Sequence, residues 1–193
     1  EWNPRDEHSF TPALCNRIDR NTGGIVMAAK NAETLRILNQ KIKDREIAKF
    51  YLAIIHGRMA PPQGKLEGFL LKDESRAQVK VFHKPVPGGK SAATLYKTLK
   101  VNRGLSLVEC ELLTGRTHQI RAQFAAAGHP LLGDGKYGRE RDNKQYGRSF
   151  QALYSYKLEF TFPTDAGLLE YLRGKVFTVE NVDFVAEYFG EQE

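Results

Sequence analysis

The sequence is poor in cysteine and has no residue spacing that is typical of a metal site. Its 193 residues include only two cysteines, Cys15 and Cys110, which lie far apart and form no C-x-x-C pair. The five histidines show no ligand spacing such as H-E-x-x-H. Zinc sites depend on such patterns, so we predict no metal and no metal cofactor. Unpaired cysteines also favour a reducing compartment, and we therefore expect a cytoplasmic protein.

Long apolar runs are absent as well. No stretch approaches the roughly 18 consecutive apolar residues of a membrane-spanning helix, so we predict no contact with a membrane. We find no internal repeat, low-complexity segment or interdomain linker. The chain is 41% hydrophobic and 27% charged, which predicts a globular core and excludes disorder. We therefore treat residues 1–193 as one domain.

Acidic residues are fewer than basic ones, and the two kinds are unevenly spread. The chain has 29 Lys and Arg against 23 Asp and Glu, so its net charge is +6, and its isoelectric point is about 9.3. Residues 116–148 contain seven basic and three acidic side chains, whereas residues 176–193 contain five acidic and no basic ones. A basic central region favours a polyanionic partner such as a nucleic acid.

Strand patterns are more frequent than helical ones. Residues 48–55 are rich in aromatic and β-branched side chains, which favours a strand. Asn31 is a suitable cap for a helix that extends to about Asp44, because Leu, Leu and Ile recur there at helical spacing. Turn residues punctuate 61–108, which indicates antiparallel hairpins, and a second helix is expected from Gly115 or Thr117 to residue 127. These elements predict an α+β fold with a largely antiparallel or mixed sheet.

The first segment with possible chemistry surrounds Asp19, which has Arg17 and Arg20 on either side. One interpretation is a simple turn, in which Asp or Asn bonds the backbone before Gly23 and Gly24. The other is that the two guanidinium groups stabilise an ionised carboxylate that acts as a nucleophile. No serine, cysteine or lysine beside an evident base offers a rival nucleophile, so Asp19 is our candidate.

The second segment is the strand that contains Tyr51. An aromatic residue in a strand usually belongs to the core. The two-residue period, however, places Tyr51 on the same face as Lys49, and Phe50 and Leu52 on the other. A tyrosine beside a lysine could instead line a cleft, where it would stack on a base and present its hydroxyl.

The third segment, T-G-R-T-H-Q-I-R at residues 114–121, opens the second expected helix. Arg121 could be an ordinary solvated arginine. Alternatively, Arg116, His118 and Arg121 at a helix start could bind a phosphate or a carboxylate. Basic residues with tyrosines nearby also suit RNA.

At these three segments the chain resembles the catalytic domain of the RluA family of bacterial pseudouridine synthases. The family motif H-R-L-D-R-x-T-S-G is similar to residues 16–24, and its K-x-Y-x-A-x-x-x-G motif to residues 49–57. Its third block, T-G-R-x-H-Q-I-R followed by G-H-P-x-x-G-D-x-x-Y, is similar to residues 114–121 and 128–137. The resemblance extends from about residue 13 to residue 162.

The resemblance implies an isomerase that converts uridine to pseudouridine in RNA without a cofactor or metal. Asp19 would attack a flipped uridine at the sugar C1′ or the base C6, and Tyr51 would stack on the base and could take part in proton transfer. Arg121 would pair with Asp19 and orient it. Arg17 would help to fill the space that the extruded nucleotide leaves. The expected RNA-binding residues are Arg17, Arg20, Arg116, His118 and Gln119.

The resemblance also implies a fold, a substrate and an assembly. The fold would be the α+β pseudouridine synthase fold, with a mixed, mostly antiparallel sheet, flanking helices and a central RNA cleft. We expect 23S ribosomal RNA as the substrate, transfer RNA as the alternative, and a monomer. A different class is a non-catalytic RNA-binding domain with a decayed site. A sugar-processing enzyme fits poorly, because it would need a second carboxylate near Asp19.

Three departures from the family pattern stand out. Asn16 replaces the usual histidine and Gly23 the usual serine, and we expect activity to survive both changes. The family also has a strand-containing segment with a Lys-Pro pair before the aspartate motif, which this sequence does not show. We therefore expect that the chain lacks an N-terminal segment, and that an RNA-binding module such as an S4 domain could belong to the full protein.

Overall fold

The computed structural model describes residues 10–73 and 75–190, which form ten strands and five helices. The strands are β1 (Ala13–Leu14), β2 (Gly23–Gly24), β3 (Ala28–Ala29), β4 (Ile47–His56), β5 (Gln63–Asp73), β6 (Gln78–Phe82), β7 (Lys90–Asn102), β8 (Leu105–Leu112), β9 (Leu153–Phe160) and β10 (Val176–Thr178). The helices are α1 (Ala32–Lys43), α2 (Gln119–Ala126), α3 (Glu140–Lys144), the 3₁₀ helix η1 (Gly167–Leu172) and α4 (Asp183–Phe189).

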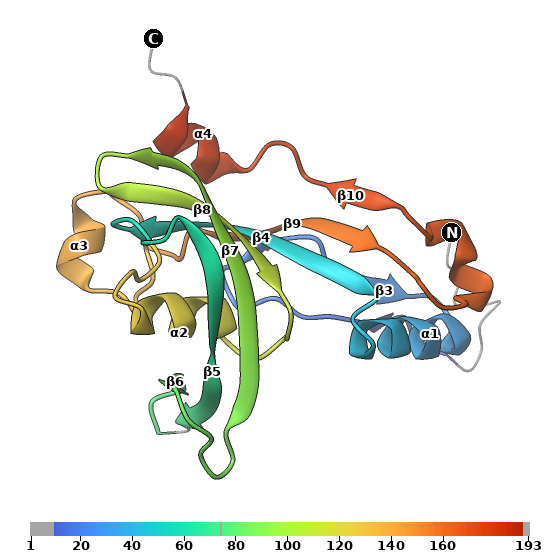
Figure 1. The fold of residues 1–193 in the computed structure, drawn as a ribbon. Helices are drawn as coiled ribbons and strands as arrows, with labels where there is room; N and C mark the ends of the chain where they lie inside the picture. The colour runs from blue at the N-terminus through green and yellow to red at the C-terminus, as the bar shows by residue number, and fades with distance from the viewer. Residues whose placement is uncertain (1–9, 74, 191–193) are drawn as a thin grey trace.

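Eight of the strands form one sheet, in the order β10-β9-β4-β8-β7-β5-β6, with β2 beside β9 (Figure 1). Among the described strands, neighbours pair antiparallel, except for β2 and β9, which pair in parallel. Strands β1 and β3 form a separate two-stranded ribbon. The structure thus has the α+β fold with a mixed, mostly antiparallel sheet that the sequence predicts.

Two elements form where the sequence pattern places them. Helix α1 begins after Asn31, whose side chain accepts a hydrogen bond from the backbone N–H of Thr34 at 2.8 Å. This contact satisfies one of the free donors of the first helical turn. Strand β4 includes the whole predicted stretch 48–55 and lies in the middle of the sheet.

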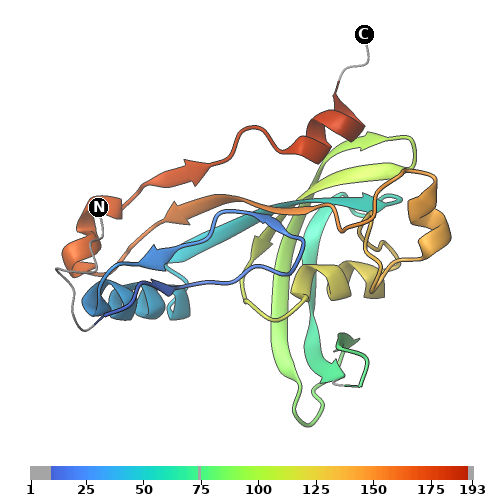
Figure 2. The same cartoon turned by 180° about the vertical axis from the view of Figure 1, so that it is seen from behind.

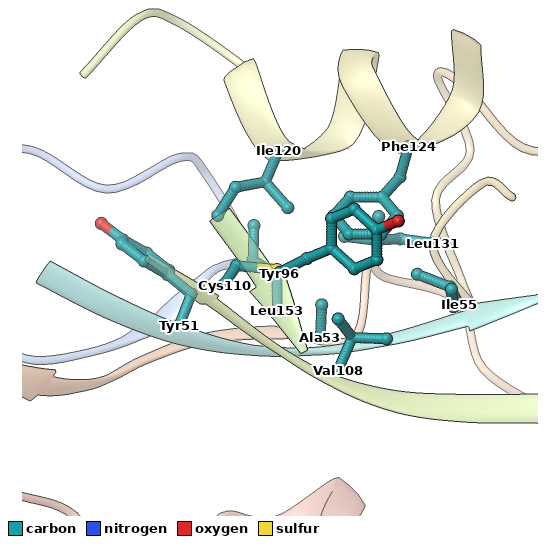
Figure 3. Close-up of a cluster of buried hydrophobic side chains, with 10 residues drawn as sticks. All are labelled: Tyr51, Ala53, Ile55, Tyr96, Val108, Cys110, Ile120, Phe124, Leu131 and Leu153. Carbon is teal, nitrogen blue, oxygen red and sulfur yellow. The ribbon is translucent and has the colours of Figure 1, made fainter. Parts of the chain in front are cut away.

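The side chains of β4 alternate between the two faces of the sheet. Tyr51, Ala53 and Ile55 pack in a buried cluster with side chains of α2 (Figure 3). Leu52 and Ile54 pack on the opposite face with side chains of α4. Helices α1 and α2 lie on one side of the sheet and α4 on the other (Figure 1). The face that α1 and α2 share carries the candidate site.

Helix α2 begins later than the sequence predicts. We expected a start at Gly115 or Thr117, but the first helical residue is Gln119. The reason is His118, which has a left-handed backbone with φ of 52° and therefore cannot continue a right-handed helix. The helix is buried on almost all sides, including Gln119, Arg121 and Gln123.

Over residues 10–73 and 75–190, no helix combines the length and the apolar character that crossing a membrane requires.

Candidate active site

A cavity of about 500 Å³ lies between the C-terminal end of α1 and the start of α2. It is lined by residues from the segment 15–22, from the turn between α1 and β4, from β4 itself and from the segment 112–120. Asp19, Tyr51 and His118 all line it. The fold thus brings together the three segments that the sequence singles out, from positions about 100 residues apart.

The segment around Asp19 is both a turn and a wall of the cavity. The backbone carbonyl of Asp19 accepts a hydrogen bond from the N–H of Thr22 at 3.0 Å, and Asn21 has a positive φ of 64°. Gln151 fixes the turn from β9's side, since its amide donates to the carbonyl of Arg20 at 2.6 Å. Figure 2 shows this N-terminal segment, in blue, running out from α1 and back. The turn interpretation is therefore confirmed, and the role of Asp19 as a nucleophile stays a prediction.

The carboxylate of Asp19 meets Arg121. Nη1 of Arg121 donates to Oδ2 of Asp19 at 3.3 Å, and no other ion pair of Asp19 occurs among the described residues. Arg17 and Arg20, its neighbours in sequence, are exposed. The structure therefore places Arg121 where the resemblance implies, although its orienting role stays a prediction. The solvated interpretation of Arg121 is wrong, because this side chain is 5% exposed.

Arg121 is held from behind by Asp134, a residue to which the sequence analysis assigned no role. The two groups form a bidentate pair, with Nε to Oδ2 at 2.7 Å and Nη2 to Oδ1 at 2.9 Å. Asp134 is fully buried and also accepts the backbone N–H of Lys136 at 2.9 Å and of Tyr137 at 3.2 Å. Its signal in the sequence was the G-D-x-x-Y pattern at residues 133–137.

The charge of Arg121 is secured by these partners. Burial lowers the pKa of Arg121, but the hydrogen bonds and negative charges of Asp134 and Asp19 outweigh burial and raise the pKa overall. When two nitrogen donors of a guanidinium bind one carboxylate, the planar group is fixed, and its third nitrogen donates in a defined direction. Asp19 therefore receives a charged, immobile partner.

Asp134 also bears on the sugar-processing alternative, which would need a second carboxylate near Asp19. Asp134 lies on the other side of the same guanidinium. It does not line the cavity and is 0% exposed. A buried carboxylate paired in this way cannot reach a substrate, so the arrangement is not the open carboxylate pair of a glycosidase.

His118 is coupled to Tyr137. Its Nδ1 lies 2.9 Å from the Tyr137 hydroxyl oxygen, which also accepts the backbone N–H of Val79 at 2.8 Å. Burial raises the pKa of Tyr137 to about 12, so the hydroxyl keeps its proton. Burial also lowers the pKa of His118. This geometry favours a neutral imidazole that accepts the Tyr137 proton at Nδ1 and carries its own proton on Nε2.

Replacing Tyr137 by phenylalanine is expected to raise the pKa of His118. The hydroxyl that stabilises the neutral ring would be lost, so protonation would become easier. NMR titration of the histidine Cε1 protons should show His118 below its ordinary range in the wild type and higher in Tyr137→Phe. Exposed His83 serves as the control and should not change. An unchanged His118 midpoint would contradict the assigned tautomer.

Tyr51 satisfies both interpretations of the sequence. Its side chain is 6% exposed and belongs to the buried cluster with Phe124 and Tyr96. It lies at the edge of that cluster, and its hydroxyl points away from the other two rings (Figure 3). Burial, assisted by the negative charge of Asp19, raises the pKa of Tyr51 and keeps the phenol neutral. Its contact with a base stays a prediction.

The predicted RNA-binding residues divide into three groups. Arg17, Arg116 and His118 line the cavity, and both arginines are exposed. Arg20 is exposed but does not line it. Gln119 is 3% exposed, and its amide makes four hydrogen bonds. Because both its donors and its acceptor are used within the protein, Gln119 holds α2 against β7, and RNA contact through this amide does not fit.

The two departures in the Asp19 motif have structural counterparts. Asn16 Oδ1 accepts the backbone N–H of Met27 at 2.7 Å, so it joins the motif to the segment before β3. At Gly23, a Cβ atom would lie 2.6 Å from Cε2 of Tyr154. The ring of Tyr154 therefore occupies the space that a side chain at position 23 would need.

Replacing Gly23 by serine should lower the free energy of unfolding by about 1–3 kcal/mol, because the Tyr154 ring must move. Urea denaturation measures the change. The double variant Gly23→Ser/Tyr154→Val should lose less than the sum of its single changes. Gly135→Ser is the matched control, since a Cβ there would meet nothing within 4 Å. Additive losses would show that Tyr154 is not the obstacle.

Within the described part of the chain, no three His, Cys, Asp or Glu side chains gather in a way that could hold a metal ion.

Comparison with known proteins identifies the class to which this site belongs. The family model for RNA pseudouridylate synthase matches residues 2–126. Two solved human structures share the fold: RNA pseudouridylate synthase domain-containing 4, with a TM-score of 0.70 at 20% identity, and domain-containing 1, with 0.68 at 21%. They cover 90% and 92% of this chain, which covers 72% and 79% of theirs. The fold prediction is confirmed.

Bacterial relatives narrow the family. Ribosomal large subunit pseudouridine synthase D of Borreliella burgdorferi is 36% identical over 154 residues, which are 80% of this chain and 46% of the relative. Ribosomal large subunit pseudouridine synthase C of Vibrio parahaemolyticus is 32% identical over 160 residues, 81% of this chain and 50% of the relative. The chain belongs to the RluA-type family of RNA pseudouridine synthases. It spans about half the length of these curated relatives.

Proposed function

We propose that this chain is the catalytic part of an enzyme that isomerises uridine to pseudouridine in RNA. The observation that carries the proposal is the ion pair between Asp19 and Arg121 beside a cavity that residues of all three family motifs help to line. Family membership supports the same reaction class. Asp19 is the proposed nucleophile, Arg121 its orienting partner and Tyr51 the aromatic group against the base.

The cavity has the size and lining that such a reaction needs. Its volume of about 500 Å³ is in the usual range of small-ligand sites. A base inside a helix cannot reach it, so the uridine must be extruded. Ile120 and Leu153, which line the cavity near Tyr51, provide an apolar surface for the base.

The chemistry needs only groups that the cavity holds. Asp19 would form a bond with C1′ while the N1–C1′ bond breaks, or would add to C6 of the base. On either route the N1–C1′ bond breaks, the uracil rejoins the sugar through C5, and the bond to Asp19 breaks to restore the carboxylate. C5 loses its proton and N1 gains one, so the product is an isomer and no electrons leave the site. The neutral Tyr51 hydroxyl is a candidate for one of these proton transfers.

Ribosomal RNA is the proposed substrate, because the two bacterial relatives are named for the large ribosomal subunit. Transfer RNA is the alternative within the same chemistry. We also propose that the protein is a monomer and that it acts in the cytoplasm.

Tritium release tests the reaction and its substrate together. Transcripts of 23S rRNA and of transfer RNA, labelled with tritium at C5 of uridine, would be incubated separately with the chain. We expect release from 23S rRNA alone, since forming the C5–C1′ bond expels the label. Release from transfer RNA alone would contradict the proposal that ribosomal RNA is the substrate. No release from either, with salt-sensitive RNA binding retained, would support a non-catalytic RNA-binding domain instead.

A further inference from the structure

Lys49 presents an ammonium group to the same cavity without a partner. It lies on β4 two residues before Tyr51 and lines the cavity. Its Nζ lies over Gly115, where an added Cβ would be 3.6 Å away. Among residues 10–73 and 75–190, the structure gives this ammonium no hydrogen bond and no ion pair, although burial lowers the pKa of Lys49.

A second lysine in the same chain shows how unusual this is. Lys49 is half-buried, whereas Lys41 is fully buried. Nζ of Lys41, however, lies 2.6 Å from a carboxylate oxygen of Glu46 and 2.6 Å from the Thr164 hydroxyl. Burying a charge is costly unless it is paired and hydrogen-bonded. The fold meets this requirement at Lys41 and leaves it unmet at Lys49. An anion that arrives from solution would meet it.

The surroundings of Lys49 favour an anion. Four further cations line the cavity and are exposed: Arg17, Lys43, Arg45 and Arg116. Asp19 is the only acidic residue in the described lining, and Arg121 already neutralises it. Gly115 leaves open space above the ammonium that a larger side chain would fill.

We propose that Lys49 binds a backbone phosphate next to the flipped uridine. The inference rests on the proposed function, because it takes the occupant of the cavity to be a nucleotide. The Cα atoms of Lys49 and Tyr51 are roughly 6.6 Å apart along one face of β4, a distance that one nucleotide can span. If the base lies against Tyr51, its phosphate therefore reaches Lys49. The ammonium is a positioning and binding group, distinct from the nucleophile.

Nucleotide titration reads out this contact without turnover. The probes are uridine 3′-monophosphate, uridine 5′-monophosphate, uridine and inorganic phosphate, added to the chain with ¹³C-labelled lysine. We expect one monophosphate to shift the Lys49 Cε signal and raise the pKa of Lys49, and uridine to leave both unchanged. Lys49→Gln should weaken that monophosphate about 10- to 100-fold and uridine less than about twofold. Lys49→Arg should recover most of the affinity, because it restores the charge.

Kinetics separate phosphate binding from acid–base catalysis. In tritium release, Lys49→Gln should raise KM about 10-fold or more and change kcat by less than about threefold, and Lys49→Arg should restore KM. Lys30→Gln is the control, because it removes the same single positive charge at a distance from the cavity. Lys30 is exposed and precedes the N-terminal end of α1, whereas the cavity lies at the C-terminal end of that helix. This variant should behave as the wild type.

Two results would overturn the inference. One is equal binding of uridine and both monophosphates by Lys49→Gln and the wild type. The other is a loss of kcat at unchanged KM that arginine does not rescue, which would make Lys49 an acid–base group. Absence of tritium release from the wild type would contradict the proposed function alone, since the titration measures the phosphate contact independently.

Discussion

Replacing Asp19 by asparagine is expected to lower the rate of tritium release by at least about 10⁴-fold, the scale seen when a covalent nucleophile is removed. An amide has the shape of the carboxylate but cannot act as its nucleophile. The amide oxygen can still accept the Arg121 donor that now lies 3.3 Å from Oδ2 of Asp19. The fold and the cavity should therefore persist, and RNA affinity should stay within about threefold of the wild type, well under 1 kcal/mol.

Single-turnover tritium release and filter binding would measure the two quantities on the same RNA. Glu33→Gln is the matched control, because it removes an exposed carboxylate in the first turn of α1, away from the cavity. It should leave both quantities unchanged. Turnover within 10-fold of the wild type in Asp19→Asn would show that another group forms the covalent bond.

Short-range patterns explain which parts of the fold the sequence predicts. The two-residue period of β4 correctly places Lys49 and Tyr51 at one cavity, although the pairing of β4 with β9 shifts register between Phe50 and Tyr51. The Asn31 cap and the apolar spacing after it predict α1 almost to the residue. The predicted start of α2 was wrong, because the left-handed backbone of His118 depends on its tertiary contacts. No local pattern signals that conformation.

Burial explains most of what the sequence could not predict at the site. Gln119 stands between cationic residues, so its position in the chain suggests RNA. Only the tertiary structure shows that Ala93, Thr94 and Thr114 use its amide completely. For Arg121 the sequence leaves open a solvated side chain, because the face of the helix that carries it could have been exposed. The tertiary structure shows that this residue is buried.

Long-range pairing explains the rest. Arg121 lies 13 residues before Asp134 and 102 after Asp19, and neither separation carries a local signal. The resemblance supplied the Asp19 pair but assigned no role to Asp134. A bidentate contact of this kind needs the loop after α2 to fold back over the helix, which only the structure shows.

Replacing Asp134 by alanine is expected to lower the free energy of unfolding by about 3–5 kcal/mol, the usual loss when one partner of a buried ion pair is removed. The change would leave the buried guanidinium of Arg121 without its main partner and would leave two backbone N–H groups without an acceptor. Arg121 could then turn away from Asp19, so tritium release should also fall by at least about 10-fold, the scale of an outer-shell contact. Urea denaturation and single-turnover kinetics would measure the two effects.

The control for Asp134 is a surface carboxylate in a comparable pair. Asp142 lies 3.3 Å from Nε of Arg141, and both side chains are substantially exposed. Asp142→Ala should cost less than about 1 kcal/mol, as exposed ion pairs do. The double variant Arg121→Met/Asp134→Leu should recover much of the stability lost in Asp134→Ala, because apolar side chains can replace a buried pair. It should not recover activity, since Asp19 would then have no cation to orient it. A stable Asp134→Ala variant with full activity would show that Arg121 needs no support from behind.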